Sequence, residues 1–208
     1  MVRKTGIVWA AAACLLLAAS ATATVDPVIV NPGFEAGVDP WQMYDDGGQG
    51  NAVLDTTVSH TGSASGKLYL RWYGGTIEQY IACSLQAERE LVLTWWMKMP
   101  EAGSESNKWF GALLVARASD GTVALAQFER FDPILEWTQQ TLRVTPSFPV
   151  VQVRVYTTTG AGGGGYDGWD KPVWVDDFAL TVVPEPSGVL ALSGLLVSLV
   201  APRLRRRT

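Results

Sequence analysis

Short runs of alternating apolar and polar residues, separated by turn-forming residues, limit most strongly what this chain can fold into. Successive side chains of a β-strand point to opposite faces, so this alternation is typical of strands with one buried face. No long stretch keeps the 3.6-residue apolar period of an amphipathic helix. Turn signals recur between the runs, at residues 31–33, 45–48, 74–75, 100–103, 120–121 and 160–168. The central part of the chain is therefore predicted to be all-β.

The alternation also places the individual strands. They are predicted at residues 28–30, 52–58, 67–73, 76–84, 90–99, 109–118, 123–131, 136–145, 150–157 and 173–182. Many short strands at this spacing are typical of a sandwich or jelly roll. The predicted fold is an all-β, two-sheet jelly-roll sandwich over residues 24–182, flanked by an N-terminal signal helix and a C-terminal hydrophobic helix.

The last segment, residues 183–208, has a different composition. It opens with Val183, Pro184, Glu185 and Pro186, and the two prolines end any element before them. Residues 187–201 are uncharged and rich in Leu, Val, Ala and Gly, and an arginine cluster follows at Arg203, Arg205, Arg206 and Arg207. The apolar run is somewhat shorter than the about 20 residues that cross a bilayer, and flanking arginines stay cytoplasmic. We expect a membrane-inserted helix with the rest of the chain outside the cytoplasm.

This combination of a Val-Pro-Glu-Pro motif, a short apolar helix and terminal arginines resembles the PEP-CTERM sorting signal of Gram-negative bacteria. The resemblance implies recognition and processing by an exosortase-type membrane protease. It also implies export through the inner membrane to the cell surface or the exopolysaccharide matrix, with only transient membrane contact. An ordinary C-terminal membrane anchor is the alternative, and it leaves the tail attached.

The N-terminal residues 1–23 have the order of a secretory signal peptide. A basic start, Arg3 and Lys4, precedes an apolar run at 7–19 and small residues at the end, with cleavage expected after Ala21 or Ala23. Cys14 raises the alternative of a lipoprotein signal. That cysteine lies inside the apolar run rather than after it, which favours simple cleavage.

Removal of both end segments makes the remaining domain strongly acidic. Of 16 Lys and Arg, six lie in the end segments, and of 20 Asp and Glu only Glu185 does, so 10 basic and 19 acidic residues remain. Nucleic-acid binding depends on clustered Lys and Arg, so nucleic acid is excluded as a partner, whereas glycans and cations are compatible. Cys83 is then the one cysteine left, and we expect a small buried side chain rather than an internal disulfide.

A second resemblance covers most of the domain. It is carried by residues 31–35 (Asn-Pro-Gly-Phe-Glu) with Trp41, residues 60–62 (His-Thr-Gly), the run 67–70, Gln79, the run 91–98 with paired tryptophans, and residues 173–178 (Val-Trp-Val-Asp-Asp-Phe). These pieces, in this order, resemble the galactose-binding-like jelly rolls of carbohydrate-binding module families 4 and 9. The resemblance implies carbohydrate as a partner, although many such domains bind no known glycan.

The same resemblance implies a structural calcium ion. Its ligands would be the side chains of Glu35 and Asp176, the carbonyl of Gly33 and carbonyls near residues 63–67, and calcium favours such hard oxygen donors. Strand alternation places Asp176 on the face of Phe178 and Leu180, where a buried carboxylate needs a cation or hydrogen bonds. In the alternative, Asp176 accepts backbone N–H bonds and Glu35 is a solvated turn residue.

Alternation also selects candidate sugar-binding side chains. Pyranose rings stack on exposed aromatic rings while their hydroxyls bond to polar groups. In three predicted strands the apolar residues alternate and should face the core, which leaves aromatic and polar residues on the opposite face. The apolar residues are Leu68, Leu70 and Trp72 in the first strand, residues 91, 93, 95, 97 and 99 in the second, and Val151, Val153 and Val155 in the third. If these strands are neighbours, a platform forms from Tyr69, Arg71, Tyr73, Trp96, Gln152, Arg154 and Tyr156. In the alternative the aromatic residues pack in the core, as we expect for Trp72, Trp95 and Trp137.

Catalysis has little support in the sequence. There is one histidine, His60, and no nucleophile elbow, zinc-ligand spacing or phosphate-binding loop. A glycosidase needs only two carboxylates across a cleft, for which Glu78, Glu129 and Asp132 are candidates, but nothing in their spacing favours that role. The sequence predicts a non-catalytic surface or matrix protein that binds carbohydrate. The alternatives are a structural protein without a specific ligand and, less favoured, a jelly-roll glycosidase.

Overall fold

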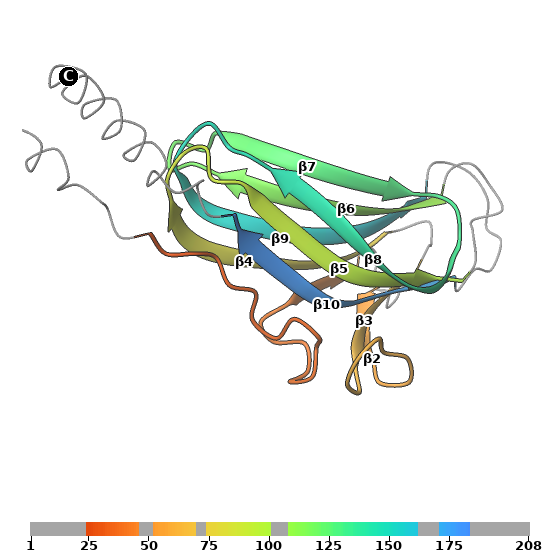
Figure 1. The fold of residues 1–208 in the computed structure, drawn as a ribbon. Coiled ribbons are helices and arrows are strands. Elements are labelled where there is room, and N and C mark those ends of the chain that lie inside the picture. The colour runs from red at the N-terminus through yellow and green to blue at the C-terminus, as the bar shows by residue number, and fades with distance from the viewer. Residues whose placement is uncertain (1–23, 46–51, 70–73, 101–107, 162–170, 184–208) are drawn as a thin grey trace, which may run out of the picture.

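The chain folds into two β-sheets that pack face to face (Figure 1). In this computed structural model, residues 24–45, 52–69, 74–100, 108–161 and 171–183 are described. Within these ranges there is no helix, and none is therefore long and apolar enough to cross a membrane. The prediction of an all-β sandwich is confirmed. The signal peptide, the sorting motif and its apolar helix lie outside the described residues.

Each sheet has five antiparallel strands. The first sheet has the order β1-β4-β9-β6-β7, formed by Gln42–Asp45, Gly75–Leu85, Val150–Ala161, Lys108–Arg117 and Val123–Arg130. The second sheet has the order β2-β3-β10-β5-β8, formed by Ala52–Asp55, Ser65–Tyr69, Pro172–Val182, Leu91–Met99 and Ile134–Val144. Most neighbours in each sheet are distant in sequence, so the turn signals alone do not give this order.

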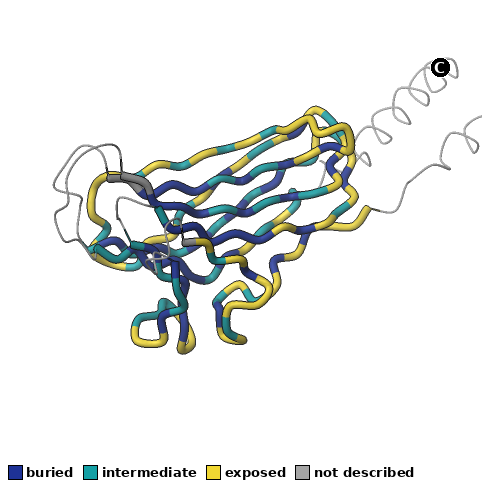
Figure 2. The backbone as a smooth tube through the Cα atoms, turned by 180° about the vertical axis from the view of Figure 1, so that it is seen from behind, coloured by how far each residue is buried: buried dark blue, intermediate teal, exposed yellow. Residues whose placement is uncertain are grey.

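Alternating apolar residues fill the space between the sheets. In β5, Leu91, Leu93, Trp95, Met97 and Met99 are fully buried, whereas the residues between them are half-exposed. Figure 2 shows buried positions concentrated along the strands and exposed positions at the turns. The predicted inward set of β5 is confirmed, because a strand with one buried face keeps a period of two.

Two predicted core residues do not lie in the core. Val151 is 42% exposed, next to a shift in register between β4 and β9. Trp137 is half-exposed and packs edge-on against His60, outside the core cluster. Trp95 is fully buried, as expected, and Trp72 lies outside the described residues. Cys83 is half-buried, and burial raises its pKa to about 11.

The N-terminal segment differs from the prediction. Residues 28–30 are not a strand. Instead the backbone of Val30 pairs with the side chain of Gln79, whose amide accepts from Val30 N and donates to Val30 O, both at 2.9 Å. A buried side-chain amide thus replaces a strand partner. The short strand β1, which follows Trp41, was not predicted, because its four residues lie between Pro40 and the turn signal at 45–48.

Strand β10 contains a β-bulge that changes which residues share a face. Its pairing with β5 shifts in register between Asp176 and Ala179, and Asp177 has a positive φ of 48°. Asp176 pairs with Trp96 on the outer face, whereas Phe178 is buried in the core. The prediction that Asp176 shares a face with Phe178 is therefore wrong, because a bulge inserts a residue into the alternation.

Candidate functional site

The outer face of the first sheet carries a cluster of aromatic and polar side chains. Pairing of β4 with β9 puts Glu78 opposite Tyr156 and Tyr80 opposite Arg154, on the face turned away from the core residues Ile77 and Val155. Pairing of β1 with β4 adds the next strand to the same face. We call this cluster the Arg154 platform; it comprises Gln42, Tyr44, Glu78, Tyr80, Gln152, Arg154 and Tyr156.

Arg154 lies at the centre of this platform. Its guanidinium forms an ion pair with the carboxylate of Glu78. It also lies 4.4 Å from the ring centroid of Tyr156 and 5.2 Å from that of Tyr80. A cation within about 6 Å of an aromatic ring is attracted to it. The ion pair and the two rings therefore hold the long arginine side chain in one position on the sheet.

Exposure within the platform is uneven. Glu78 is only 3% exposed although it is on an outer face, whereas Tyr80 and Tyr44 are 44% and 48% exposed. The hydroxyl of Tyr44 donates to the side-chain oxygen of Gln42. The ion pair, with Glu78 buried and Arg154 half-buried, thus lies at the base of a surface that displays tyrosine rings and amide groups to solvent. Such a surface offers stacking and hydrogen bonding together.

The structure separates the sugar-binding residues predicted from the sequence. Gln152, Arg154 and Tyr156 lie together on β9 of the first sheet, but Tyr69 and Trp96 lie on β3 and β5 of the second. Within that sheet β10 lies between β3 and β5. Arg71 and Tyr73 lie outside the described residues. The three strands therefore do not form one platform.

Sequence reasoning missed the β4 and β1 members of the Arg154 platform. The alternation of β4 contained a usable signal, because Glu78 and Tyr80 are polar or amphipathic residues two apart, between the apolar Ile77 and Ile81. That β4 lies beside β9 follows only from the sheet order. Of the other carboxylates considered for catalysis, Glu129 is exposed on β7 and Asp132 is exposed in the loop after it.

Tyr69 belongs to a buried polar cluster on the outer face of the second sheet. Lys67 lies 5.0 Å from the ring centroid of Tyr69 and 5.5 Å from that of Trp174. Asp55 accepts a hydrogen bond from Trp174 Nε1 at 3.0 Å. It also accepts one from Lys67, with which it forms an ion pair at 3.0 Å. Asp55 and Trp174 are nearly buried. The geometry is that of a structural cluster covering this end of the sheet.

Trp96 has one ring face covered. The imidazole of His60 stacks on it with centroids 3.9 Å apart and planes 14° apart. His60 is held there by Asp177, whose carboxylate lies 2.6 Å from His60 Nδ1, and by Asp176, which accepts from the backbone N–H of His60 at 2.8 Å. A sugar ring would have to displace this stacked loop to reach that face of Trp96.

The predicted calcium ligands do lie close together. A Cβ placed on Gly33 would be 3.4 Å from an oxygen of Asp176, 3.1 Å from one of Asp177 and 4.0 Å from the Cγ of Glu35. Both carboxylates already accept N–H bonds, Glu35 from Ser63 and Ala64, and Asp176 from His60 and Asp177. For Asp176 these contacts match the alternative, in which backbone N–H groups satisfy its carboxylate. Glu35 differs from that alternative, because its exposed carboxylate also accepts backbone N–H bonds.

The donor chemistry around Gly33 fits calcium in type, but side chains alone do not complete a site. Carboxylate oxygens are the ligands that calcium prefers. Among the residues that the structure describes, however, no three His, Cys, Asp or Glu side chains converge closely enough to hold a metal. Backbone carbonyls would have to supply the remaining ligands. The calcium site at Gly33, Glu35 and Asp176 stays a prediction.

The two carboxylates differ in their electrostatics. Burial raises the pKa of Asp176 to about 6, against the opposing effect of the N–H groups of His60 and Asp177. Hydrogen bonds from Ser63 and Ala64 lower the pKa of the exposed Glu35. Asp176 is fully buried, so a cation or a proton would each relieve the cost of its charge.

The fold is similar to those of solved carbohydrate-binding modules. No protein-family model matches the sequence, and no curated protein matches it. A family 61 carbohydrate-binding module, solved with β-1,4-galactotriose, is 19% identical with a TM-score of 0.52, over 76% of this chain and 99% of that chain. A family 16 carbohydrate-binding module is 16% identical with a TM-score of 0.52, over 74% and 98% of the two chains.

The similarity extends to a domain within a larger protein. The enzymatically active part of a bacteriophage tailspike protein is 12% identical with a TM-score of 0.51, over 74% of this chain but 21% of that chain. At these identities the similarity concerns the fold alone, and the specific likeness to families 4 and 9 stays a prediction. The described residues form a jelly-roll β-sandwich like those of carbohydrate-binding modules.

Proposed function

We propose that this protein binds carbohydrate, without catalysis, through the Arg154 platform. The observation that carries the proposal is the position of Arg154 between Tyr80 and Tyr156, with its charge paired to the buried Glu78. Exposed tyrosine rings can stack on the C–H face of a sugar, and the amide and guanidinium groups can bond to its hydroxyls. The fold supports the proposal, because both full-length structural matches described above are carbohydrate-binding modules.

The paired charge favours a neutral polysaccharide at this surface. Glu78 neutralises Arg154 within the platform, so a ligand needs no charge of its own to match it. The family 61 module was solved with β-1,4-galactotriose, which makes β-1,4-galactan a reasonable first probe, with native exopolysaccharide and other neutral β-linked glycans beside it.

Affinity electrophoresis through gels containing each polysaccharide tests this proposal. Tyr80→Ala and Tyr156→Ala should each weaken retention about tenfold, which corresponds to about 1.4 kcal/mol, because each removes one stacking ring. Trp96→Ala on the second sheet is the matched control and should leave retention unchanged. Thermal melting of each variant separates loss of binding from loss of folding.

Other outcomes would support different functions. Loss of retention in Trp96→Ala but not in Tyr80→Ala would move the binding surface to the second sheet. No retention on any glycan or on native exopolysaccharide would favour a structural protein without a specific ligand. Release of reducing ends from the same polysaccharides would indicate a glycosidase.

We further propose that the end segments deliver this domain to the cell surface or matrix. The support is the sequence alone: a signal peptide at 1–23, and Val183, Pro184, Glu185 and Pro186 followed by the apolar run and the arginines. Strand β10 ends at Val182, so processing near Pro184 by an exosortase-type protease would release essentially the whole sandwich. Mass spectrometry of the surface protein tests this, and a product that retains residues 205–207 would instead indicate a permanent anchor.

A further inference from the structure

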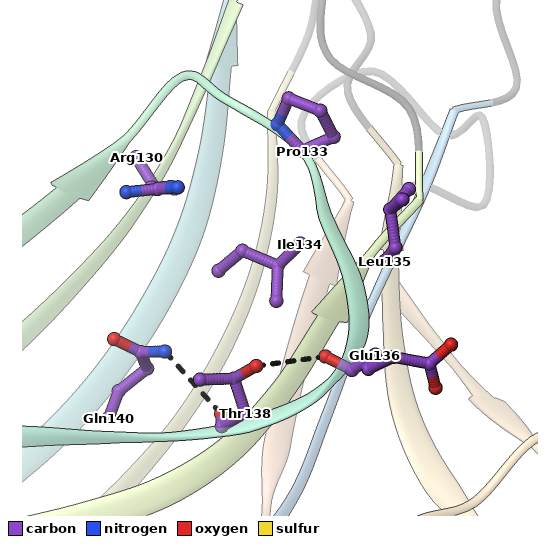
Figure 3. Close-up of a pocket in the computed structure, with 7 residues that line it drawn as sticks. All are labelled: Arg130, Pro133, Ile134, Leu135, Glu136, Thr138 and Gln140. Carbon is purple, nitrogen blue, oxygen red and sulfur yellow. Dashed lines mark hydrogen bonds between the residues drawn. The ribbon is translucent and has the colours of Figure 1, made fainter.

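A second polar site lies away from the Arg154 platform, at the open edge of the sandwich. A pocket of about 410 Å³ lies where β7 passes into β8, the edge strands of the two sheets. Figure 3 shows the side chains that line it, which are Arg130, Pro133, Ile134, Leu135, Glu136, Thr138 and Gln140. This volume is within the range of about 300–1,000 Å³ that is typical of small-molecule sites.

Three polar side chains of this pocket occupy positions that face the space between the sheets. Arg130 pairs with Phe110, Thr138 with Met97 and Gln140 with Trp95, and these three partners are all fully buried core residues. Inward positions further along the same strands are apolar, for example Phe128 and Leu142. Thr138 is exposed and Arg130 and Gln140 are half-buried, so solvent and a ligand can reach these positions.

Arg130 is a cation without a carboxylate partner in the part of the chain that the structure describes. Its Nε donates to the backbone oxygen of Asp132 at 3.2 Å, and no ion pair includes it. Lys67, Arg143 and Arg154, in contrast, each pair with an acid. The half-buried guanidinium therefore keeps N–H donors for a ligand.

The nearby acids do not neutralise Arg130. Figure 3 shows the Glu136 carboxylate at the opposite side of the pocket, directed away from Arg130. Glu129 pairs with Gly111 on the outer face of the first sheet, opposite to the side on which Arg130 lies. The amide of Gln140 makes only a long contact, 3.4 Å, with Thr138 O. One wall of the pocket thus offers a free cation and an adaptable amide.

The other wall of the pocket is apolar. It is formed by Pro133, Ile134 and Leu135, and Leu135 is 63% exposed. A ligand that fits both walls carries an anionic group for Arg130 and an apolar face for the aliphatic side chains. Guanidinium groups bind carboxylates with two parallel hydrogen bonds, which adds geometric specificity. A sugar ring that bears a carboxylate has both features.

We propose that this pocket binds a single hexuronic acid residue, with its carboxylate on Arg130 and its ring against Ile134 and Pro133. This site is independent of the Arg154 platform, which lies on the outer face of the first sheet and carries a neutralised arginine. The protein would then contact neutral and acidic parts of one polysaccharide, or two different polysaccharides, through separate surfaces.

Titration of the purified full chain with matched sugars, followed by amide chemical shifts in NMR spectra, tests the proposal. D-Galacturonate and D-glucuronate should shift signals of residues 130–140, whereas D-galactose and D-glucose, which lack the carboxylate, should bind at least tenfold more weakly. Acetate is the third arm, and it should also bind more weakly, because it offers no ring for Ile134. Added salt should weaken uronate binding, since the contact depends on charge.

Arg130→Gln should remove the preference for uronate over the neutral sugar. Arg143→Gln is the matched control, because it removes an exposed arginine from β8, the edge strand that also carries Gln140. This variant should preserve the preference for uronate, and so should Tyr80→Ala in the platform. Equal binding of galactose and galacturonate, equal binding of acetate and uronate, or shifts that spare residues 130–140 and their strand partners at 95–99 and 110 would overturn the proposal. The chemical-shift map of the unsubstituted protein decides the location even if Arg130→Gln folds poorly.

Discussion

Asp55 is nearly buried and yet ionised. Burial alone would raise its pKa, but hydrogen bonds from Thr57 and Trp174, together with Lys67, hold the pKa well below its usual range. A carboxylate whose pKa is lower in the folded than in the unfolded protein stabilises the fold at pH values above its unfolded pKa. That stabilisation is lost as the pH falls from the unfolded pKa toward the folded pKa. The cluster on β2, β3 and β10 therefore depends on the charge of one carboxylate.

Asp55→Asn should lower the free energy of unfolding by about 3 kcal/mol at pH 7, because it leaves the half-buried ammonium of Lys67 without its carboxylate partner. Urea unfolding measures this loss. The difference from the unsubstituted protein should shrink below about pH 4, where Asp55 of the unfolded chain begins to take up a proton while the folded carboxylate stays ionised.

Glu90→Gln supplies the matched control for that measurement. It removes the acid of the Glu90–Arg143 pair, in which Arg143 is 60% exposed. Exposed pairs contribute about 0–1 kcal/mol. If the two substitutions cost the same, burial does not set the strength of the Asp55 cluster.

At the scale of elements, the bulge in β10 fixes the loop of residues 56–64 to the second sheet. The left-handed backbone at Asp177 turns its carboxylate toward His60 and Thr61, which contact it at 2.6 Å and 2.8 Å. The neighbouring Asp176 accepts the backbone N–H of His60. Two consecutive acids thus hold one loop, and that loop covers Trp96.

Asp177→Gly and Asp177→Ala separate the two roles of this residue. Both remove the carboxylate and should increase hydrogen exchange across residues 56–64. Alanine should cost about 1–2 kcal/mol more than glycine, because only glycine adopts a positive φ without strain. Equal unfolding free energies for the two variants would show that the backbone at 177 relaxes.

The strands show where sequence reasoning succeeds and where it stops. The period of two gave β5 and the inward valines Val153 and Val155 correctly, because it depends on local geometry. It failed at Asp176, where the bulge inserts a residue, and at 28–30, where the partner is the side chain of Gln79. Neither a bulge nor a hydrogen bond from a side chain to a strand backbone can be predicted from the alternation of apolar and polar residues.

At the scale of the whole molecule, the candidate site shows a second limit. Alternation selected Gln152, Arg154 and Tyr156 from β9, but it gave no information on neighbouring strands. The partners Glu78 and Tyr80 come from a strand about 75 residues away in sequence. Sheet order is set by long-range packing, so alternation identifies candidate residues but does not show which strands lie side by side.

The predicted calcium site would link the N-terminal segment, the loop 56–64 and β10, so it should affect the melting of the whole domain. At 100-fold excess over its Kd, a bound ion stabilises the folded state by about 2.7 kcal/mol. Calorimetry with calcium and with a chelator should therefore differ by several degrees at pH 7.5.

The calcium effect should become smaller at pH 5. Because the pKa of Asp176 is raised to about 6, a proton occupies this carboxylate below that pH and competes with the ion. Asp176→Asn should abolish the calcium shift, and Asp120→Asn, in an exposed turn, should retain it. An identical melting temperature with and without calcium would exclude the ion.

Strand β5 runs from the end of the sandwich where the described chain begins and ends to the end that holds the Arg130 pocket. Its first residue, Leu91, pairs with Val182 at the end of β10, and Val25 bridges to Ser84 near the end of β4. Both ends of the described chain therefore leave the sandwich on the same side (Figure 1). Its last residue, Met99, pairs with Ile134 in the pocket wall. At about 3.4 Å per residue the two ends of this strand are about 27 Å apart. A tether at either terminus would therefore hold the Arg130 pocket at the far tip, pointing away from the surface to which the protein is attached.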